Sequence, residues 1–148
     1  MTVDPLPRVH IIGTGGSIAG VGHDRLDMTQ YGDTGKKLNV GQLLCQIPRV
    51  NNMAKISSED FSNVTSNSFT TKDWIVLANH INELFKHDPQ LSGIAITHGS
   101  MTIEETAYFL NLTIKSSRPV VLTGSLRPST AISSDAQINI LDCILVAG

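Results

Sequence analysis

Two short turns in this sequence combine hydroxyl side chains with glycine, and these residue types can build a nucleophilic site. The first turn follows an apolar run at residues 8–13 and reads Thr14-Gly15-Gly16-Ser17. A hydroxyl at the end of a strand can attack a carbonyl carbon when a neighbouring base takes its proton. Glycines let the backbone turn tightly and approach a ligand closely. Thr14 is therefore our candidate for the attacking hydroxyl.

The second turn, residues 97–101, lies inside a predicted strand–helix–strand unit. Residues 93–97 are apolar, residues 102–114 carry apolar side chains at helical spacing, and residues 120–123 read as a second buried strand. Thr102 and Glu105 fit a capping box at the start of the helix. Such a unit has parallel strands and a right-handed crossover. Ligands bind at the carboxyl ends of strands in these sheets, which is where this turn lies.

The remaining segments extend the same pattern. Apolar spacing predicts a short helix before Pro48, a strong amphipathic helix over residues 74–85 and a last helix over residues 135–147. We expect Ser133 and Ser134 to cap the last helix, with its inward face formed by Ile138, Leu141, Ile144 and Leu145. Weak strand signals occur at residues 54–56 and 61–65. The predicted fold is a three-layer, doubly wound α/β domain with a mostly parallel sheet and flanking helices.

A nucleotide site is an alternative interpretation of the first glycine turn. A dinucleotide fingerprint needs a glycine at position 18 after Gly13 and Gly15, but Ile18 stands there. The Gly-Lys-Ser/Thr of a P-loop is also missing. The five histidines show no metal-ligand spacing with one another or with the cysteines. We therefore predict no cofactor and no metal.

Residues 21–37 are polar and spaced by glycines, which predicts a mobile loop. Tyr31 is its one aromatic residue. From the residues alone, Tyr31 either anchors the loop at the surface or closes over a site as part of a lid.

Composition excludes several classes of function. The chain has 148 residues, a formal charge of -2 and no basic run, which argues against nucleic-acid binding. Its apolar runs are too short to span a membrane, and its first residues lack the apolar core of a secretory signal, which favours the cytoplasm. Cys45 and Cys143 lie among apolar residues, so we predict two buried core thiols.

Both turns, with their flanks, closely resemble the signatures of the bacterial-type asparaginase/glutaminase amidohydrolases. The similar stretches are IIGTGGSIAG, THGSMTIEETAYFLNLT and PVVLTGSLRPSTAISSD. The resemblance runs from residue 8 to residue 147. It implies that residues 1–148 are an incomplete N-terminal asparaginase-like domain without the family's second domain. It also implies hydrolysis of L-asparagine or L-glutamine to the acid and ammonia by a homo-oligomer.

The resemblance assigns a role to individual residues. Thr14 corresponds to the nucleophile and Tyr31 to a lid tyrosine that assists it. Ser66 corresponds to a serine that holds the substrate's carboxylate, and Asn67 stands where the family has glutamine. Ser100 replaces a second family threonine and keeps its hydroxyl.

Two departures leave the activity open. Met101 stands where the family has an aspartate that binds the substrate's ammonium group and joins a Thr-Lys-Asp triad. The triad lysine has no counterpart in these 148 residues. The sequence therefore supports two hypotheses: an asparaginase-type enzyme, or a catalytically inactive descendant that binds an amino acid or a partner chain.

Overall fold

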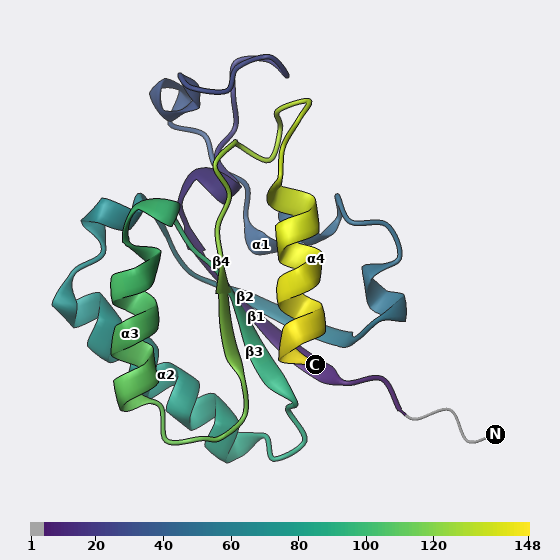
Figure 1. Cartoon of the computed structure of the whole chain (residues 1–148), viewed down its shortest axis with the longest axis vertical. Helices are drawn as coiled ribbons and strands as arrows, with labels where there is room; N and C mark the ends of the chain where they lie inside the picture. Colours follow the sequence, from purple (N-terminus) through teal and green to yellow (C-terminus); the bar gives the residue numbers. More distant parts are fainter. Residues whose placement is uncertain (1–4) are drawn as a thin grey trace.

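The computed structural model describes residues 5–148 and contains one parallel sheet (Figure 1). Its four strands lie in the order β2-β1-β3-β4. They are β1 (Arg8–Gly15), β2 (Lys55–Val64), β3 (Gly93–Thr97) and β4 (Val120–Thr123). Every adjacent pair is parallel, with Ile11 opposite Ala95 and Ile96 opposite Leu122. The predicted α/β class and the parallel strand–helix–strand unit are confirmed.

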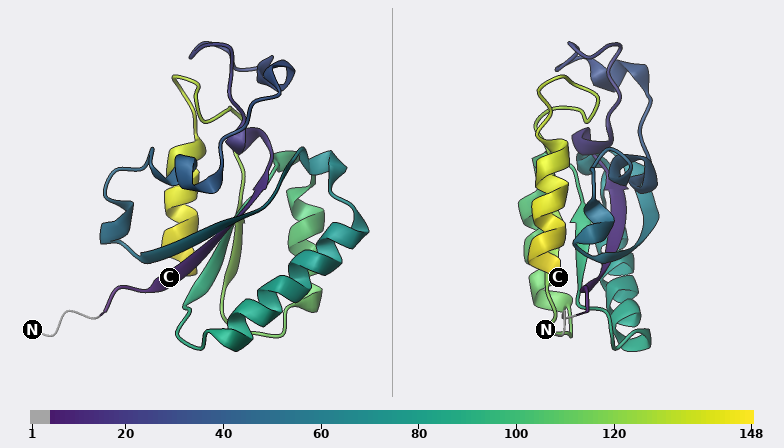
Figure 2. Two further views of the ribbon diagram at one scale, coloured as in Figure 1. Left: turned by 180° about the vertical axis from the view of Figure 1, so that it is seen from behind. Right: turned by 90° about the vertical axis from the view of Figure 1, so that its right-hand side faces the viewer.

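Helices cover both faces of the sheet and make three layers. They are α1 (Val40–Leu44), α2 (Thr71–His87), α3 (Ile103–Thr113) and α4 (Ala136–Ala147). Figure 1 shows α2 and α3 on one side and α4 on the other, and the edge-on view of Figure 2 shows the sheet between α4 and α2. Two separate apolar cores result, one beneath α1 and α4 and one beneath α2 and α3.

The strands differ in burial as their positions require. β3 is buried at all five positions, as expected for a central parallel strand covered by helices on both faces. β2 lies at the edge and exposes most of its side chains. Two weak strand signals in the sequence are therefore parts of one continuous edge strand.

Helix capping differs from the prediction at α3. Thr102 precedes this helix, but its hydroxyl donates to the backbone oxygen of Ser66 at 3.1 Å and caps nothing. The tertiary contact has replaced the predicted capping box. The N-cap residue of α4 is Asp135, which makes no side-chain cap hydrogen bond, but the Ser134 hydroxyl just before it accepts from the Ala136 amide at 3.1 Å. Reciprocal capping boxes begin α1 at Asn39 and α2 at Thr70.

The inward face of α4 was only partly predicted. Ile144 is buried, but Ile138 and Leu145 are 54% and 53% exposed. Small residues face the sheet instead, which allows the helix to approach it closely: Ala136, Cys143 and Ala147. Cys143 is buried as expected, and burial raises the pKa of its thiol to about 12. The prediction for Cys45 was wrong, because α1 ends at Leu44 and leaves this thiol exposed.

The strand order reverses between β1 and β3, and the turns that follow these strands are packed backbone against backbone. A Cβ atom on Gly16 would lie 2.3 Å from the Cα of Gly99. A Cβ atom on Gly99 would lie 2.5 Å from the Cβ of Ser66, in the turn after β2. Three strand-end turns therefore converge at the switch point of the sheet, where α/β folds of this kind bind ligands.

This packing predicts that Gly99→Ala destabilises the protein without straining the backbone, since Gly99 has φ -77°. We expect a loss of about 1–3 kcal/mol in the free energy of unfolding, the usual cost of overpacking. Urea unfolding followed by circular dichroism measures it. Gly32→Ala is the matched control, because a Cβ atom there meets nothing within 4 Å. Equal effects of the two changes would contradict the close approach.

Candidate functional site

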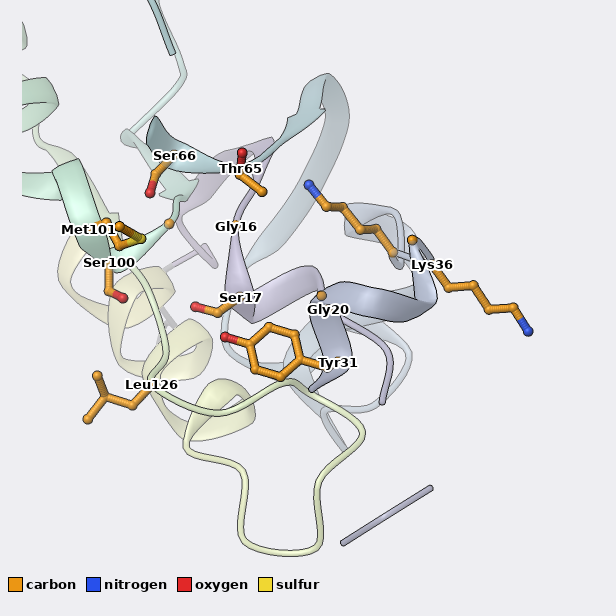
Figure 3. A pocket seen from close by; sticks show the side chains of 14 residues that line it. Gly16, Ser17, Gly20, Tyr31, Lys36, Thr65, Ser66, Ser100, Met101 and Leu126 are labelled. Atoms are coloured by element: carbon orange, nitrogen blue, oxygen red, sulfur yellow. The ribbon is translucent and has the colours of Figure 1, made fainter. Parts of the chain in front are cut away.

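A pocket of about 180 Å³ opens where the strand-end turns converge (Figure 3). The turns after all four strands and the loop at residues 21–37 contribute to its wall. The lining residues are Gly16, Ser17, Gly20, Tyr31, Gly32, Gly35, Lys36, Lys37, Thr65, Ser66, Gly99, Ser100, Met101 and Leu126.

Four of the six site residues predicted from the sequence line this pocket: Tyr31, Ser66, Ser100 and Met101. They come from three different segments that lie far apart in the sequence. Thr14 and Asn67 are not among the lining residues. Asn67 is exposed because the 3-10 turn Ser66–Ser68 buries Ser66 and points the next residue outward.

Thr14 lies inside β1 and ties the sheet together. It is 2% exposed, and its hydroxyl donates to the backbone oxygen of Thr97 at 2.9 Å. The Ser62 hydroxyl donates in turn to the backbone oxygen of Thr14 at 3.0 Å. These bonds join the carboxyl ends of β1, β2 and β3. The Thr14 hydroxyl therefore supports the turns, at a position where the pocket does not reach it.

Ser17 lines the pocket with a hydroxyl, although it was not among the site residues predicted from the sequence. Gly15 and Gly16 have φ of 98° and 82°, and this left-handed stretch turns the chain out of the strand. Ser17 follows directly, half-buried, and its hydroxyl donates to the backbone oxygen of Ser125 at 2.5 Å. Its position in the sequence could have indicated this role. Ser17 follows the glycine pair and lies beyond the end of β1, whereas Thr14 still lies within the strand.

The loop at residues 21–37 lies over the Ser17 turn. The Tyr31 ring packs on Gly20, where a Cβ atom would lie 2.7 Å from ring atom Cδ2. Thr34 holds the loop by donating its hydroxyl to the backbone oxygens of Val21 and Tyr31, at 2.7 and 2.9 Å. Figure 3 shows the Tyr31 phenol oxygen pointing toward the Ser17 hydroxyl. A phenol and an aliphatic hydroxyl therefore both line this pocket.

Comparison with known proteins identifies the family. The sequence model of the family described as "Asparaginase, N-terminal" matches residues 8–148. This chain belongs to the asparaginase family. The resemblance seen in the two turns is thereby confirmed.

Individual family members are similar in sequence to this chain over nearly its whole length. L-asparaginase 2 of Bacillus subtilis is 43% identical over 143 residues, which cover 97% of this chain and 37% of that protein. A glutaminase-asparaginase of Acinetobacter glutaminasificans is 41% identical and covers 95% and 41%. The crystal structure of a probable cytoplasmic L-asparaginase from Campylobacter jejuni superposes with a TM-score of 0.87 at 42% identity, covering 96% of this chain and 42% of the other.

The chain spans about two fifths of the length of these asparaginase relatives. The names of the relatives also place family members in two compartments, since a probable periplasmic L-asparaginase of Haemophilus influenzae is 37% identical. Among residues 5–148, no helix combines the length and the apolar character needed to cross a membrane. In the same residues, no three His, Cys, Asp or Glu side chains are grouped as metal ligands.

His98 supports a turn of the pocket and does not line the pocket itself. Its Nδ1 lies 2.9 Å from the backbone oxygen of Gly99, which can only accept, so Nδ1 carries the proton. Its Nε2 then accepts from the Thr106 hydroxyl at 3.1 Å, and Trp74 Nε1 donates to the same hydroxyl at 2.8 Å. This chain of bonds suits a neutral imidazole. Burial lowers the pKa of His98 accordingly.

The lowered pKa of His98 predicts that stability depends on pH. Below pH 6.5, where the histidine of the unfolded chain takes up a proton, the folded imidazole resists protonation. The free energy of unfolding should therefore fall as pH decreases from about 7.5 to 5.5, with a slope of up to roughly 1.4 kcal/mol per unit. Urea unfolding at each pH measures it.

The control for this prediction is His98→Gln, which cannot titrate and should show a smaller pH slope than the parent. Parallel slopes for the parent and His98→Gln would overturn the assignment of a buried neutral imidazole.

Thr14 and Ser17 should respond differently to loss of their hydroxyls. Thr14→Val removes a buried hydrogen bond at nearly constant volume, so we expect a loss of about 1–3 kcal/mol in the free energy of unfolding. Ser17 is half-buried at a pocket wall, and water can replace its hydroxyl in Ser17→Ala, so we expect less than about 1 kcal/mol. Thermal and urea unfolding of the two variants make the comparison. A larger loss for Ser17→Ala would contradict the assignment of Thr14 as the structural tie.

Proposed function

We propose that this chain is an asparaginase-type amidohydrolase unit that cleaves the terminal amide of a small amide acid, with Ser17 as the nucleophile. The single observation that carries the proposal is the position of the Ser17 hydroxyl. It lies in the pocket wall at the switch point of the sheet, directly after a left-handed glycine pair and facing the Tyr31 phenol. The names of the relatives support the reaction class, since they are asparaginases and glutaminase-asparaginases.

In this proposal, Ser17 Oγ attacks the amide carbon and forms an ester to the acyl group. Its proton moves to the amide nitrogen, which leaves as ammonia, and Tyr31 is the group that relays it. Water then hydrolyses the ester and restores the hydroxyl. Ser66 and Ser100 offer hydroxyls from the turns after β2 and β3 that can orient the substrate's oxygens. Thr14, the nucleophile expected from the resemblance, instead holds the turn in place.

A second candidate is binding without catalysis. The specific observation in its favour is Met101, which is 72% exposed on the pocket wall and offers no acid or base. Among residues 5–148, the Ser17 hydroxyl has no lysine or carboxylate as a hydrogen-bond partner that could assist ester formation. The homo-oligomer and the incomplete domain implied by the resemblance stay predictions, and either a second copy or a further chain could supply such a group.

Ammonia release from L-asparagine, L-glutamine and succinamate by the purified chain tests the proposal. Ser17→Ala should lower the rate at least about 100-fold, as expected when a nucleophile is removed. Ser17→Thr keeps a hydroxyl and should retain activity that Ser17→Ala lacks. Thr14→Val should keep most of the activity at a temperature where it is folded.

Retained activity in Ser17→Ala together with lost activity in Thr14→Val would identify Thr14 as the nucleophile. A folded parent that releases no ammonia from any amide would reject hydrolysis and leave binding as the function. Circular dichroism of every variant separates loss of chemistry from loss of fold.

A further inference from the structure

We propose that Asp135, at the start of α4, is a positioning residue that orients the Ser17 hydroxyl by fixing the turn at residues 124–127. The inference rests on the proposed function, because it names what holds that nucleophile in place. Its basis is a continuous series of hydrogen bonds that runs from α4 through this turn to Ser17.

The Ser17 hydroxyl is oriented by one backbone oxygen. It donates to the oxygen of Ser125 at 2.5 Å, and Ser125 is 2% exposed. A serine side chain has three staggered rotamers, and an acceptor held in a fixed place favours the one that reaches it. A carbonyl oxygen does not take up the serine's proton, so this contact orients the hydroxyl and leaves proton transfer to other groups. The position of the Ser125 oxygen therefore decides where Ser17 Oγ points.

The Asp135 carboxylate holds the turn that carries this oxygen. Its Oδ2 accepts from the Leu126 amide at 3.1 Å and its Oδ1 accepts from the Arg127 amide at 3.2 Å. Burial alone would raise the pKa of the Asp135 carboxyl, but hydrogen bonds from these amides hold the pKa below its ordinary value. The group is therefore charged at neutral pH, and hydrogen bonds to a charged acceptor are the stronger kind. Asp135 makes no side-chain bond that caps α4, so its carboxylate serves the turn and not the helix.

Asn139 completes the attachment from one turn further along α4. Its Nδ2 donates to Asp135 Oδ2 at 3.0 Å and to the backbone oxygen of Gly124 at 2.9 Å. Both neighbours of Ser125 in the chain, Gly124 and Leu126, are thus bonded to side chains of this helix. The Ser125 oxygen is therefore fixed relative to α4, and loss of the Asp135 carboxylate removes two of the bonds that fix it.

The segment between β4 and α4 also holds the loop at residues 21–37, but through other residues. Thr130 Oγ1 accepts from the Gly22 amide at 3.0 Å, and the Ile132 amide donates to the backbone oxygen of Arg25 at 2.8 Å. Thr130→Val removes the first of these bonds and leaves the hydrogen bonds of the turn at residues 124–127 in place. This variant therefore separates a general loosening of the segment from an effect that reaches Ser17 through its acceptor.

NMR measurement of the three-bond couplings to the Ser17 β-protons tests the inference without requiring catalysis. We expect one dominant side-chain rotamer in the parent and averaging over several rotamers in Asp135→Ala. Asp135→Asn keeps one acceptor oxygen for the turn and should give an intermediate result. Asp142→Ala removes an exposed carboxylate from the same helix and is the matched control. Both Asp142→Ala and Thr130→Val should keep the couplings of the parent.

Kinetics give the second measurement. Asp135→Ala should lower kcat for ammonia release about tenfold, the effect of losing one orienting hydrogen bond. The KM should change less, because Ser66 and Ser100, which are proposed to orient the substrate, lie on other turns. Circular dichroism checks that each variant is folded. If Asp135→Ala does not fold, Asp135→Asn makes the same comparison.

The two measurements distinguish failure of the inference from failure of the proposed function. Rotamer averaging in Asp135→Ala, with no ammonia release by the parent, supports the positioning of Ser17 and rejects the proposed hydrolysis. Ammonia release by the parent, with unchanged Ser17 couplings or an unchanged kcat in Asp135→Ala, supports hydrolysis and overturns the inference. Rotamer averaging of equal extent in Asp142→Ala or Thr130→Val would also overturn it.

Discussion

The site depends on the contact between the backbones of Gly16 and Gly99 across the switch point of the sheet. Neither glycine has room for a side chain, since a Cβ atom on Gly16 would lie 2.3 Å from the Cα of Gly99, and one on Gly99 would lie 2.5 Å from the Cβ of Ser66 and 3.2 Å from the Cα of Gly16. Hydrogen bonding fixes the same approach from inside the sheet, because the Thr14 hydroxyl binds the backbone oxygen of Thr97. Loss of this packing would separate the turns that carry Ser17 and Ser100, so the pocket exists only while the two strand ends stay in contact.

The second support is the buried chain of hydrogen bonds from Trp74 through Thr106 to His98. It ends on the backbone oxygen of Gly99, so it orients the very turn that touches Gly16. Buried polar groups are costly unless each one is paired, and here every donor and acceptor in the chain has a partner. A tryptophan of α2, remote from the pocket, is thereby linked by hydrogen bonds to a turn that forms the pocket.

Much of this arrangement could be predicted from the sequence, because it depends on local sequence patterns. Apolar periodicity located β1, β3, β4 and the long helices, and two strand-end motifs located the pocket. Sequence could not resolve which hydroxyl of Thr14-Gly15-Gly16-Ser17 faces a ligand, since that depends on where the ladder ends. It missed the exposed face of α4 because helix rotation is set by the small residues that pack on the sheet. Thr102 was misread because its partner, Ser66, is distant in sequence.

The residues that support the turns and the residues that line the pocket differ in this molecule. Thr14, Thr106 and His98 hold the turns and do not line the pocket, whereas Met101 lines it. Met101 is mostly exposed, so its side chain can change with little consequence for packing. The pocket wall at Met101 can therefore change polarity while the glycine contact and the Ser17 hydroxyl stay in place. A substitution at Met101 is therefore expected to change the polarity of the pocket more than the stability of the turns that form it.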